Sequence, residues 1–369
     1  VRSSAASDVY KRQMQNNNIM TMNKFVAIIT QPLMTNYGCL LQNWAMQQAV
    51  NKLGYQSITF DQSEWYPPLG IRLKIAVKQL LNVSTPNVFE QFITQNINRT
   101  SKAYFMSDFV AFDKKYHPHA YIVGSDQVWR PRYNRLLDAS FLIFTTNSRK
   151  IAYAASFGTD KWEFNEQQTA AYSKAIRQFR AIGVREQSAI TLCKDYWDVD
   201  VTLVLDPTLL LTAEEYFPLL NKSNKQNHVF TYILDSESWK RVAVKSICMQ
   251  KQICELAGMY DMDGQIHERI SVGEWLTYLS QSKFVVCDSF HGTVFSILMH
   301  RPFLVLGNSK RGNTRLLSIL KAVGLENRLI QKNDSIDMSH LPDINWSDVD
   351  LRLSKLRSNS MEFLLKALA

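Results

Sequence analysis

The chain has 369 residues, of which 46% are hydrophobic and 20% are charged. This composition is typical of a globular protein long enough for two domains, and no apolar run approaches the ~18 residues of a membrane-spanning helix. The formal net charge is +9, which predicts anionic partners. Because the basic residues are dispersed, we expect an anionic substrate rather than nucleic acid.

The five cysteines are scattered and form no C-x-x-C pair. This spacing predicts reduced thiols in a cytoplasmic protein rather than a disulfide framework or a zinc site. The positive charge also allows peripheral contact with an anionic membrane, at the inner face of the cytoplasmic membrane. The sequence indicates no oligomeric state.

Residues 1–21 lack both the apolar stretch of a signal peptide and the periodicity that follows Met22. Residues 1–13 resemble translated adapter sequence, and Met14, Met20 or Met22 is a plausible native start. We therefore interpret residues 1–21 as a non-native or disordered leader outside the fold.

From residue 24 onward, strand-like and helix-like segments alternate. In the first half we predict strands at 24–30, 57–61, 120–126, 150–158, 181–184 and 201–206. Helical patterns cover 36–55, 165–180 and 186–197, and a weakly patterned helical region covers about 71–110.

Residues 221–227 form the most polar stretch of the interior, and we place a domain boundary there. The alternation then resumes, with predicted strands at 228–235, 283–287 and 303–306 and predicted helices at 236–257, 271–281, 293–301, 314–323 and 350–368. This pattern predicts two doubly wound, Rossmann-like α/β domains facing a cleft, at 22–222 and 226–345. The last segment, 346–369, is expected to form a helix that packs back across both domains.

His291 stands where a buried strand meets a helix, in the order Asp288, Ser289, Phe290, His291, Gly292. In parallel α/β sheets, ligands bind beyond the carboxyl ends of strands and beside helix N-termini. A helix N-terminus favours a neutral imidazole and a bound anion favours the charged form, so His291 is suited to proton transfer. The alternative is a histidine that only caps or packs the turn.

Arginines occupy two other strand-to-helix turns. Arg185 follows the strand 181–184, and Arg311 and Arg315 flank Gly312 in the loop after the strand 303–306. Guanidinium groups bind phosphate and carboxylate in bidentate geometry, so these turns could clamp an anion. Solvated arginines paired with acids such as Glu186 are the alternative.

Polar groups beside aromatic rings mark two candidate sugar sites. Ser125, Asp126 and Gln127 end the strand 120–126, with Trp129 close behind. After the first strand come Asn36, Tyr37 and Gly38, which form a second candidate at the same rim. A turn with a capping aspartate and a core tryptophan is the competing interpretation.

The blocks "YIVGSDQVW", "IAYAASFG", "GVREQS", "VLDPTLLL" and "VVCDSFHGTVFSILMHRPFLVLGNSKRGNTR" together resemble the polysaccharide pyruvyl transferase family. They follow that family's order, and the resemblance covers about residues 25–329. It implies a two-domain fold like that of the GT-B glycosyltransferases. It also implies transfer of pyruvate from phosphoenolpyruvate to a sugar as a ketal, on a cell-surface polysaccharide or its lipid-linked precursor.

Matched block by block, the resemblance places His291 on the acid/base histidine and Arg185 on an arginine that holds the donor, the two catalytic positions. The first half is then the acceptor side and the second half the donor side. Phosphoenolpyruvate is a co-substrate, and neither a cofactor nor a metal is expected. The donor-side residues are Ser289, Gly292, Thr293, Arg311 and Arg315, and the acceptor-side residues are Asn36, Tyr37, Gly38, Ser125, Asp126, Gln127 and Trp129.

Two alternatives stay open because a fold does not fix chemistry. One is a GT-B glycosyltransferase that uses a nucleotide-sugar. The other is a non-catalytic, glycan-binding partner in envelope assembly.

Overall fold

The computed structural model describes residues 24–63, 66, 68, 87–147, 149–223, 225–259, 261, 263, 265, 269–308 and 312–369. The predicted leader (1–21), the first part of the helical region expected at 71–110 and Arg311 lie outside the described residues.

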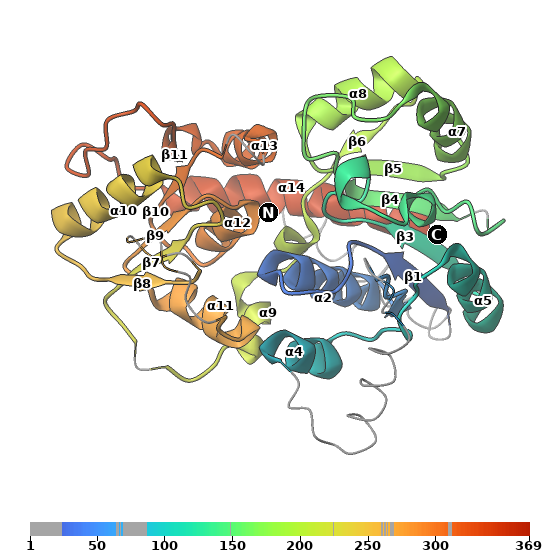
Figure 1. Cartoon of the computed structure of the whole chain (residues 1–369), viewed down its shortest axis with the longest axis horizontal. Coiled ribbons are helices and arrows are strands. Elements are labelled where there is room, and N and C mark those ends of the chain that lie inside the picture. The colour runs from blue at the N-terminus through green and yellow to red at the C-terminus, as the bar shows by residue number, and fades with distance from the viewer. Residues whose placement is uncertain are drawn as a thin grey trace, which may run out of the picture.

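Two parallel sheets organise the chain, one in each half (Figure 1). Among the described residues, the first sheet has six strands in the order β2-β1-β3-β4-β5-β6, and the second has five in the order β11-β10-β9-β7-β8. Every residue of β3 and β4 is buried, because helices cover both faces of such sheets. The predicted class, two doubly wound α/β units, is confirmed.

The first half contains strands β1 (Phe25–Ile29), β2 (Gln56–Thr59), β3 (Ala120–Val123), β4 (Lys150–Ala155), β5 (Ala181–Val184) and β6 (Thr202–Leu203). Its helices are α2 (Tyr37–Lys52), α4 (Val88–Asn96), α5 (Met106–Tyr116), α6 (Leu137–Ser140), α7 (Glu166–Ile176) and α8 (Gln187–Trp197), with the short turn η1 (Pro131–Tyr133). The connection to the second half runs through η2 (Pro207–Leu210), α9 (Ala213–Tyr216) and η3 (Phe217–Leu219).

The second half contains strands β7 (Val229–Tyr232), β8 (Glu255–Ala257), β9 (Phe284–Cys287), β10 (Phe303–Leu306) and β11 (Leu329–Ile330). Its helices are α10 (Ser238–Lys251), α11 (Val272–Gln281), α12 (Phe290–Leu298), α13 (Thr314–Val323) and the short η4 (Glu326–Arg328).

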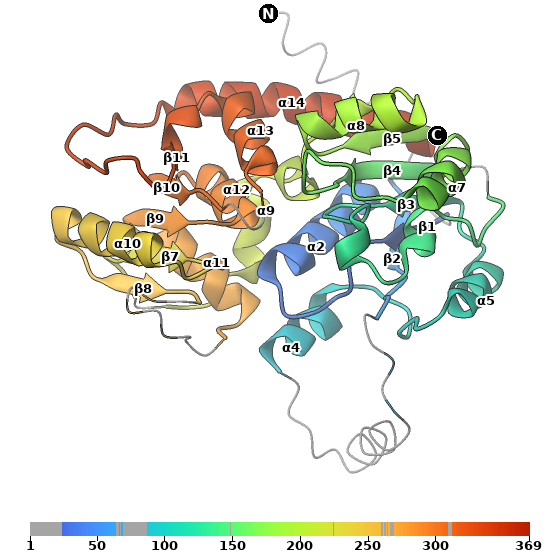
Figure 2. The ribbon, with the colours of Figure 1, turned by 45° about the horizontal axis from the view of Figure 1, so that its top comes forward.

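Helix α14 (Trp346–Leu368) joins the two halves, running along one side of both (Figures 1 and 2). Val349 and Leu353 pack in a core shared with the second half, whereas Leu364 and Leu368 pack against β1, β3 and β4. The helix begins at residue 346, where the last segment was predicted to start, four residues before the helical pattern at 350–368.

The predicted helix 236–257 is wrong in its last part. Helix α10 ends at Lys251 because Gln252 adopts a left-handed conformation with φ 54°, and Glu255–Ala257 then pairs with β7 as the edge strand β8. A non-glycine residue in this conformation leaves no stop signal in the sequence. The two-residue strand β11 was not predicted either.

The strand orders place a switch point in each sheet. In the first, β1 lies between β2 and β3, and in the second, β7 lies between β8 and β9. Ligands of open parallel sheets bind at such points, beyond the carboxyl ends of the two strands. The segments after β1, β3, β7 and β9 are therefore where the fold positions a site.

Among the described residues, no helix is long and apolar enough to cross a membrane.

Candidate active site

The turn between β9 and α12 presents His291 at the junction of the two halves. Ser289 caps α12, and its Oγ accepts a hydrogen bond of 2.9 Å from the Gly292 N–H. His291 is the second residue of the helix. The helix start was predicted at 293, but the location of His291 where a strand meets a helix is as expected.

Gly292 and Thr293 were predicted to contact the donor, but in the structure they pack within the turn between β9 and α12. A Cβ atom at position 292 would lie 2.9 Å from Cys287 Cβ and 2.7 Å from Ser289 Oγ, so only glycine fits between helix and strand. The Thr293 hydroxyl is buried and donates to the Ser289 carbonyl oxygen at 3.0 Å. Both residues stabilise the turn, and neither lines the cavities described below.

The imidazole of His291 lies between two groups of the first half. A Cβ atom at position 38 would lie 2.0 Å from His291 Nδ1, so the ring packs directly on the glycine at the start of α2. On its other side, Nε2 is 3.7 Å from Asp206 Oδ2. This Nε2 is buried and has no hydrogen-bond partner among the described residues.

Arg185 and two aspartates form a buried network behind His291. The Arg185 guanidinium donates to Asp206 Oδ2 at 2.9 Å and to Asp126 Oδ1 at 3.2 Å, and its Cζ lies 4.6 Å from the centre of the Phe290 ring. Ser125 also donates to Asp206 Oδ2, at 2.9 Å. Arg185 is thus held by acids from the turns after β3 and β6, not by its neighbour Glu186.

Burial and charge act against each other in this network. Burial alone would raise the pKa of Asp206, but its interactions with nearby His291 and with the Arg185 guanidinium outweigh burial and hold that pKa well below its usual range. The pKa of Asp126 is likewise raised by burial and lowered more strongly by Arg185 and Arg315. Burial and the charge of Arg185 together lower the pKa of Arg315 to about 10. Arg315 is the only one of these groups whose charge remains disfavoured.

A small inner cavity of about 60 Å³ lies in front of His291. Three helices begin at its wall: Gly38 belongs to the first turn of α2, His291 to that of α12 and Arg315 to that of α13. Free N–H groups and the helix dipoles make helix N-termini suitable for anions. Its described lining residues are Asn36, Gly38, Asp126, Gln127, Tyr232, Leu234, Asp288, Ser289, Phe290, His291, Gly312, Arg315 and Leu316.

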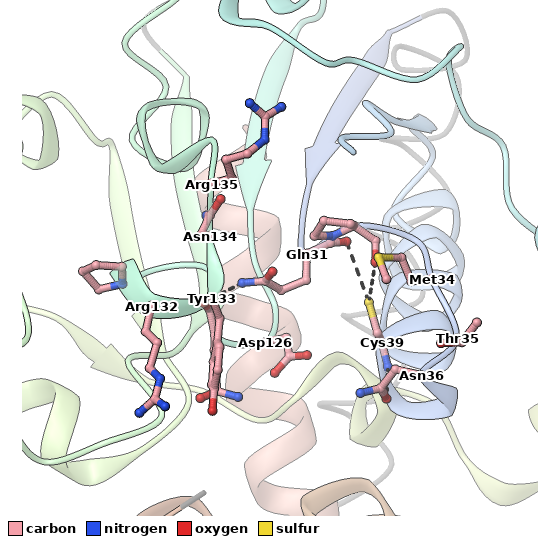
Figure 3. Close-up of a pocket in the computed structure, with 13 residues that line it drawn as sticks. Gln31, Met34, Thr35, Asn36, Cys39, Asp126, Arg132, Tyr133, Asn134 and Arg135 are labelled. Carbon is pink, nitrogen blue, oxygen red and sulfur yellow. Dashed lines mark hydrogen bonds between the residues drawn. The ribbon is translucent and has the colours of Figure 1, made fainter. Parts of the chain in front are cut away.

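A larger outer pocket of about 570 Å³ adjoins the inner cavity and shares Asn36, Asp126 and Gln127 with it. Figure 3 shows its two walls, the segment after β1 that leads into α2 and the segment of η1 after β3, with Asp126 between them. The Gln31 side-chain amide donates to the Gln127 carbonyl oxygen at 2.7 Å and links the walls. The pocket therefore lies at the switch point of the first sheet.

The predicted acceptor residues separate into two groups. Asn36, Asp126 and Gln127 line both cavities, and Gly38 lines the inner one. Ser125 is fully buried and holds Asp206.

Tyr37 and Trp129 are core side chains, which corrects their assignment as acceptor contacts. The Tyr37 hydroxyl donates to the Ile270 carbonyl oxygen at 2.8 Å, and its ring stacks on Trp275 across the two halves. The Trp129 indole is fully buried, donates to the Ser140 carbonyl oxygen and packs against Phe141. Neither ring has a face open to a sugar. Among the described residues that line the outer pocket, Tyr133 supplies an aromatic ring and is 38% exposed.

Asp206 is a candidate site residue that reasoning from the sequence missed. It follows β6 in the block "VLDP" and caps η2, with Oδ1 accepting from the Thr208 N–H and hydroxyl. An aspartate at the carboxyl end of a strand was the available signal, but its pairing with Arg185 and His291 depends on tertiary structure.

No group of three or more His, Cys, Asp or Glu side chains within the described residues is arranged to hold a metal ion.

Comparisons with known structures define the class of fold. The chain is similar to Arabidopsis thaliana UGT89C1 in complex with UDP-L-rhamnose, with a TM-score of 0.52, 8% identity and coverage of 93% of this chain and 98% of that one. It is also similar to S. aureus MnaA with UDP (TM-score 0.51, 10% identity, 93% and 91% covered). A putative UDP-N-acetylglucosamine 2-epimerase from Listeria monocytogenes gives a TM-score of 0.50 at 12% identity, with 93% and 91% covered. The chain has the GT-B fold of such glycosyltransferases and epimerases.

A search of curated proteins gives no match. A model of the polysaccharide pyruvyl transferase family matches residues 36–310, which is most of the chain. The chain therefore belongs to the polysaccharide pyruvyl transferase family. The matched region includes the switch point of the second sheet, His291, Arg185 and Asp206.

Proposed function

We propose that this transferase forms a pyruvate ketal on a sugar of a cell-surface polysaccharide or its precursor, with phosphoenolpyruvate as donor and His291 as acid and base. The observation that carries the proposal is the placement of His291 beside Arg315 at a cavity walled by the first turns of α2, α12 and α13. Phosphoenolpyruvate carries both a phosphate and a carboxylate, which arginine and helix N-termini bind well.

The reaction needs one group that both gives and takes a proton. Protonation of the methylene carbon C3 makes C2 electrophilic, and a sugar hydroxyl attacks C2. Phosphate then leaves, and a second hydroxyl of the same sugar closes the ketal. Of the two hydroxyl protons, one balances the proton gained by C3 and the other leaves with phosphate, so an imidazole can act first as acid and then as base.

The two cavities match the two substrates of this reaction. The inner cavity faces His291 and Arg315 and suits the donor, whereas the outer pocket, about ten times larger in volume, suits a sugar acceptor. The inner cavity shares Asn36, Asp126 and Gln127 with the outer pocket, so donor and acceptor would meet at these residues. A site closed around phosphoenolpyruvate would exclude water, which protects an electrophilic C2 from hydrolysis.

In this proposal Arg185 acts through the side chains that it binds. Its guanidinium is bonded to Asp126 and Asp206, so it orients the groups around the donor, while Arg315 faces the cavity directly. Cations placed where the phosphate departs stabilise the developing charge.

The test is phosphate release from phosphoenolpyruvate in the presence of galactose-, mannose- and N-acetylhexosamine-containing acceptors, with the ketal product identified by mass spectrometry. We expect release that depends on one acceptor class and is lost in His291→Ala, with an unchanged melting temperature. His340→Ala is the matched control, because His340 is 85% exposed and lies on a loop away from both cavities.

The same acceptor panel with UDP-sugars in place of phosphoenolpyruvate distinguishes the nucleotide-sugar alternative. Transfer of a sugar, with no thermal shift on addition of phosphoenolpyruvate, would replace the proposal. Binding of an acceptor without any product would favour a glycan-binding partner.

A further inference from the structure

We propose that Asp206 is a positioning residue that pairs with His291 Nε2 across the two halves, so that Nδ1 is the nitrogen that transfers the proton. This inference rests on the proposed function for the identity of the reaction, and it assigns the two ring nitrogens different tasks. It is carried by the geometry around the ring.

The Asp206 carboxylate is held in place by residues of its own half, independently of His291. Oδ1 accepts from the Thr208 N–H at 3.0 Å and from the Thr208 hydroxyl at 2.7 Å. Oδ2 accepts from Ser125 and Arg185, each at 2.9 Å. The carboxylate is completely buried, so it cannot rotate towards solvent and presents Oδ2 to the second half.

His291 Nε2 faces this oxygen at 3.7 Å and has no other partner among the described residues. A buried ring nitrogen without a hydrogen bond costs free energy, and an approach of about 1 Å would bring the pair to hydrogen-bond distance. The two residues belong to different halves, so their separation depends on how closely the halves pack.

The other nitrogen is held against the first half at a residue of the cavity wall. Nδ1 packs beside Gly38, which lines the inner cavity, whereas Nε2 is buried. If Nε2–H is donated to Asp206 throughout the reaction, Nδ1 carries the proton that moves to C3 and later accepts one from a hydroxyl. A carboxylate that orients a histidine through its second nitrogen fixes the tautomer and supports the imidazolium.

Charged groups near His291 come from several elements. Asp206 precedes η2 and Asp126 follows β3, whereas Arg185 follows β5 and Arg315 lies in the first turn of α13. Asp288, which precedes α12, lines the same cavity and pairs with Lys240 at 2.7 Å. Of these acids, Asp206 lies nearest to Nε2, so its loss should remove the partner of that nitrogen.

The test compares Asp206→Asn with Ser125→Ala. The asparagine removes the charge, whereas the alanine removes only a neutral hydrogen bond to the same oxygen. We expect kcat to fall at least about 100-fold in Asp206→Asn, with the KM for phosphoenolpyruvate changed less than about threefold. The loss in kcat should be much smaller in Ser125→Ala, which keeps the carboxylate.

Nitrogen-15 spectra of the histidine side chains test the pair without any substrate. In the wild-type protein, the neutral His291 ring should carry its proton on Nε2, with its signal assigned from its loss in His291→Gln. A neutral ring protonated on Nδ1 would overturn the proposal even if Asp206→Asn fails to fold. So would an unchanged kcat in a folded Asp206→Asn protein.

These outcomes separate the two proposals. An Nε2–H tautomer in the wild type that is lost in Asp206→Asn, in a protein that forms no ketal, keeps the pair and rejects the reaction. Ketal formation by a protein whose neutral His291 ring is protonated on Nδ1 keeps the reaction and rejects the pair.

Discussion

The imidazole of His291 lies directly on Gly38, a residue of the other half of the molecule, and no side chain fits between them. A Cβ atom at position 38 would stand 2.0 Å from Nδ1 and 2.4 Å from Cγ of the ring. The glycine is therefore required by the position of His291 and not by the backbone of α2, where it occupies the second helical position.

Gly38→Ala should therefore impair catalysis without unfolding the protein. The methyl group must displace the imidazole or hold the two halves apart, and a displacement of about 1 Å can cost about 100-fold in rate. Alanine is intrinsically better than glycine in a helix by about 1 kcal/mol, so the first half should stay folded. Steady-state turnover and thermal unfolding measure the two effects.

The control for this clash is the double variant Gly38→Ala, His291→Ala. Without the imidazole, the alanine at position 38 has room, and it should then raise the melting temperature relative to His291→Ala alone. A double-mutant cycle reports this coupling because the two residues are in contact. Wild-type turnover in Gly38→Ala would show that the ring can work from another position.

The sequence allowed most of the fold to be predicted but only part of the site. Strands such as 303–306 and helices such as 314–323 matched the structure because local hydrophobic period and capping determine them. The same local reasoning placed His291 at a helix start. It also ran the helix at 236–257 through β8, because the residue that stops α10 is a glutamine and not a glycine.

Partners distant in sequence were beyond such reasoning. Asp206 reaches Arg185 and His291 only after the halves pack together. Trp129 stands beside polar groups in the sequence, but the direction of its ring is set by the aromatic core around Phe141 and Trp197. Local sequence thus locates the rim of a site and does not tell which rim side chains point outward.

Arg315→Met should stabilise the protein while it weakens donor use. Burial lowers the pKa of this guanidinium to about 10, so its charge opposes folding at every pH below that value. Replacing a buried charge by an apolar side chain of similar length is often stabilising, here by about 1–3 kcal/mol. Loss of a charge-assisted hydrogen bond to the donor should raise the KM for phosphoenolpyruvate about 10- to 100-fold.

Thermal unfolding and donor-dependence curves measure both changes in Arg315→Met. Arg352→Met is the matched control, since Arg352 lies on the exposed side of α14 and pairs only with Asp348 among the described acids. It should change stability by no more than about 0.5 kcal/mol and leave the KM unchanged. A lower melting temperature in Arg315→Met would mean that Asp126 depends on Arg315 as well as on Arg185.

Tyr133→Ala should weaken acceptor binding and spare the donor. Tyr133 lines the outer pocket. The Arg130 Cζ atom lies 4.7 Å from the centre of the Tyr133 ring, and this contact fixes the ring in place. An aromatic face is a suitable surface for a sugar ring, and its loss should raise the KM for the acceptor about tenfold, which corresponds to about 1.4 kcal/mol. The KM for phosphoenolpyruvate should not change.

Tyr196→Ala provides the comparison for Tyr133→Ala. Tyr196 is also exposed but stacks on Trp162, away from both cavities, so its loss should affect neither KM. Equal acceptor KM values in the two variants would remove Tyr133 from the acceptor site.

The last prediction concerns α14, whose two ends lie in different cores. Leu364 is fully buried against β1, β3 and β4, and Leu364→Ala should lower the free energy of unfolding by about 2–5 kcal/mol. Leu351→Ala, on the same helix at a position 71% exposed, should change it by no more than about 0.5 kcal/mol. Chemical denaturation with fluorescence detection measures both variants.

Because the amino-terminal end of α14 packs with the second half through Val349 and Leu353, loss of its other end should also loosen the alignment of the two halves. Leu364→Ala should then reduce turnover even at temperatures where it is fully folded, since His291 and Asp206 approach each other from opposite halves. If turnover per folded molecule equals that of the wild type, α14 contributes to stability alone. The position of His291 relative to Asp206 would in that case be set by the direct contacts of α12 with α2.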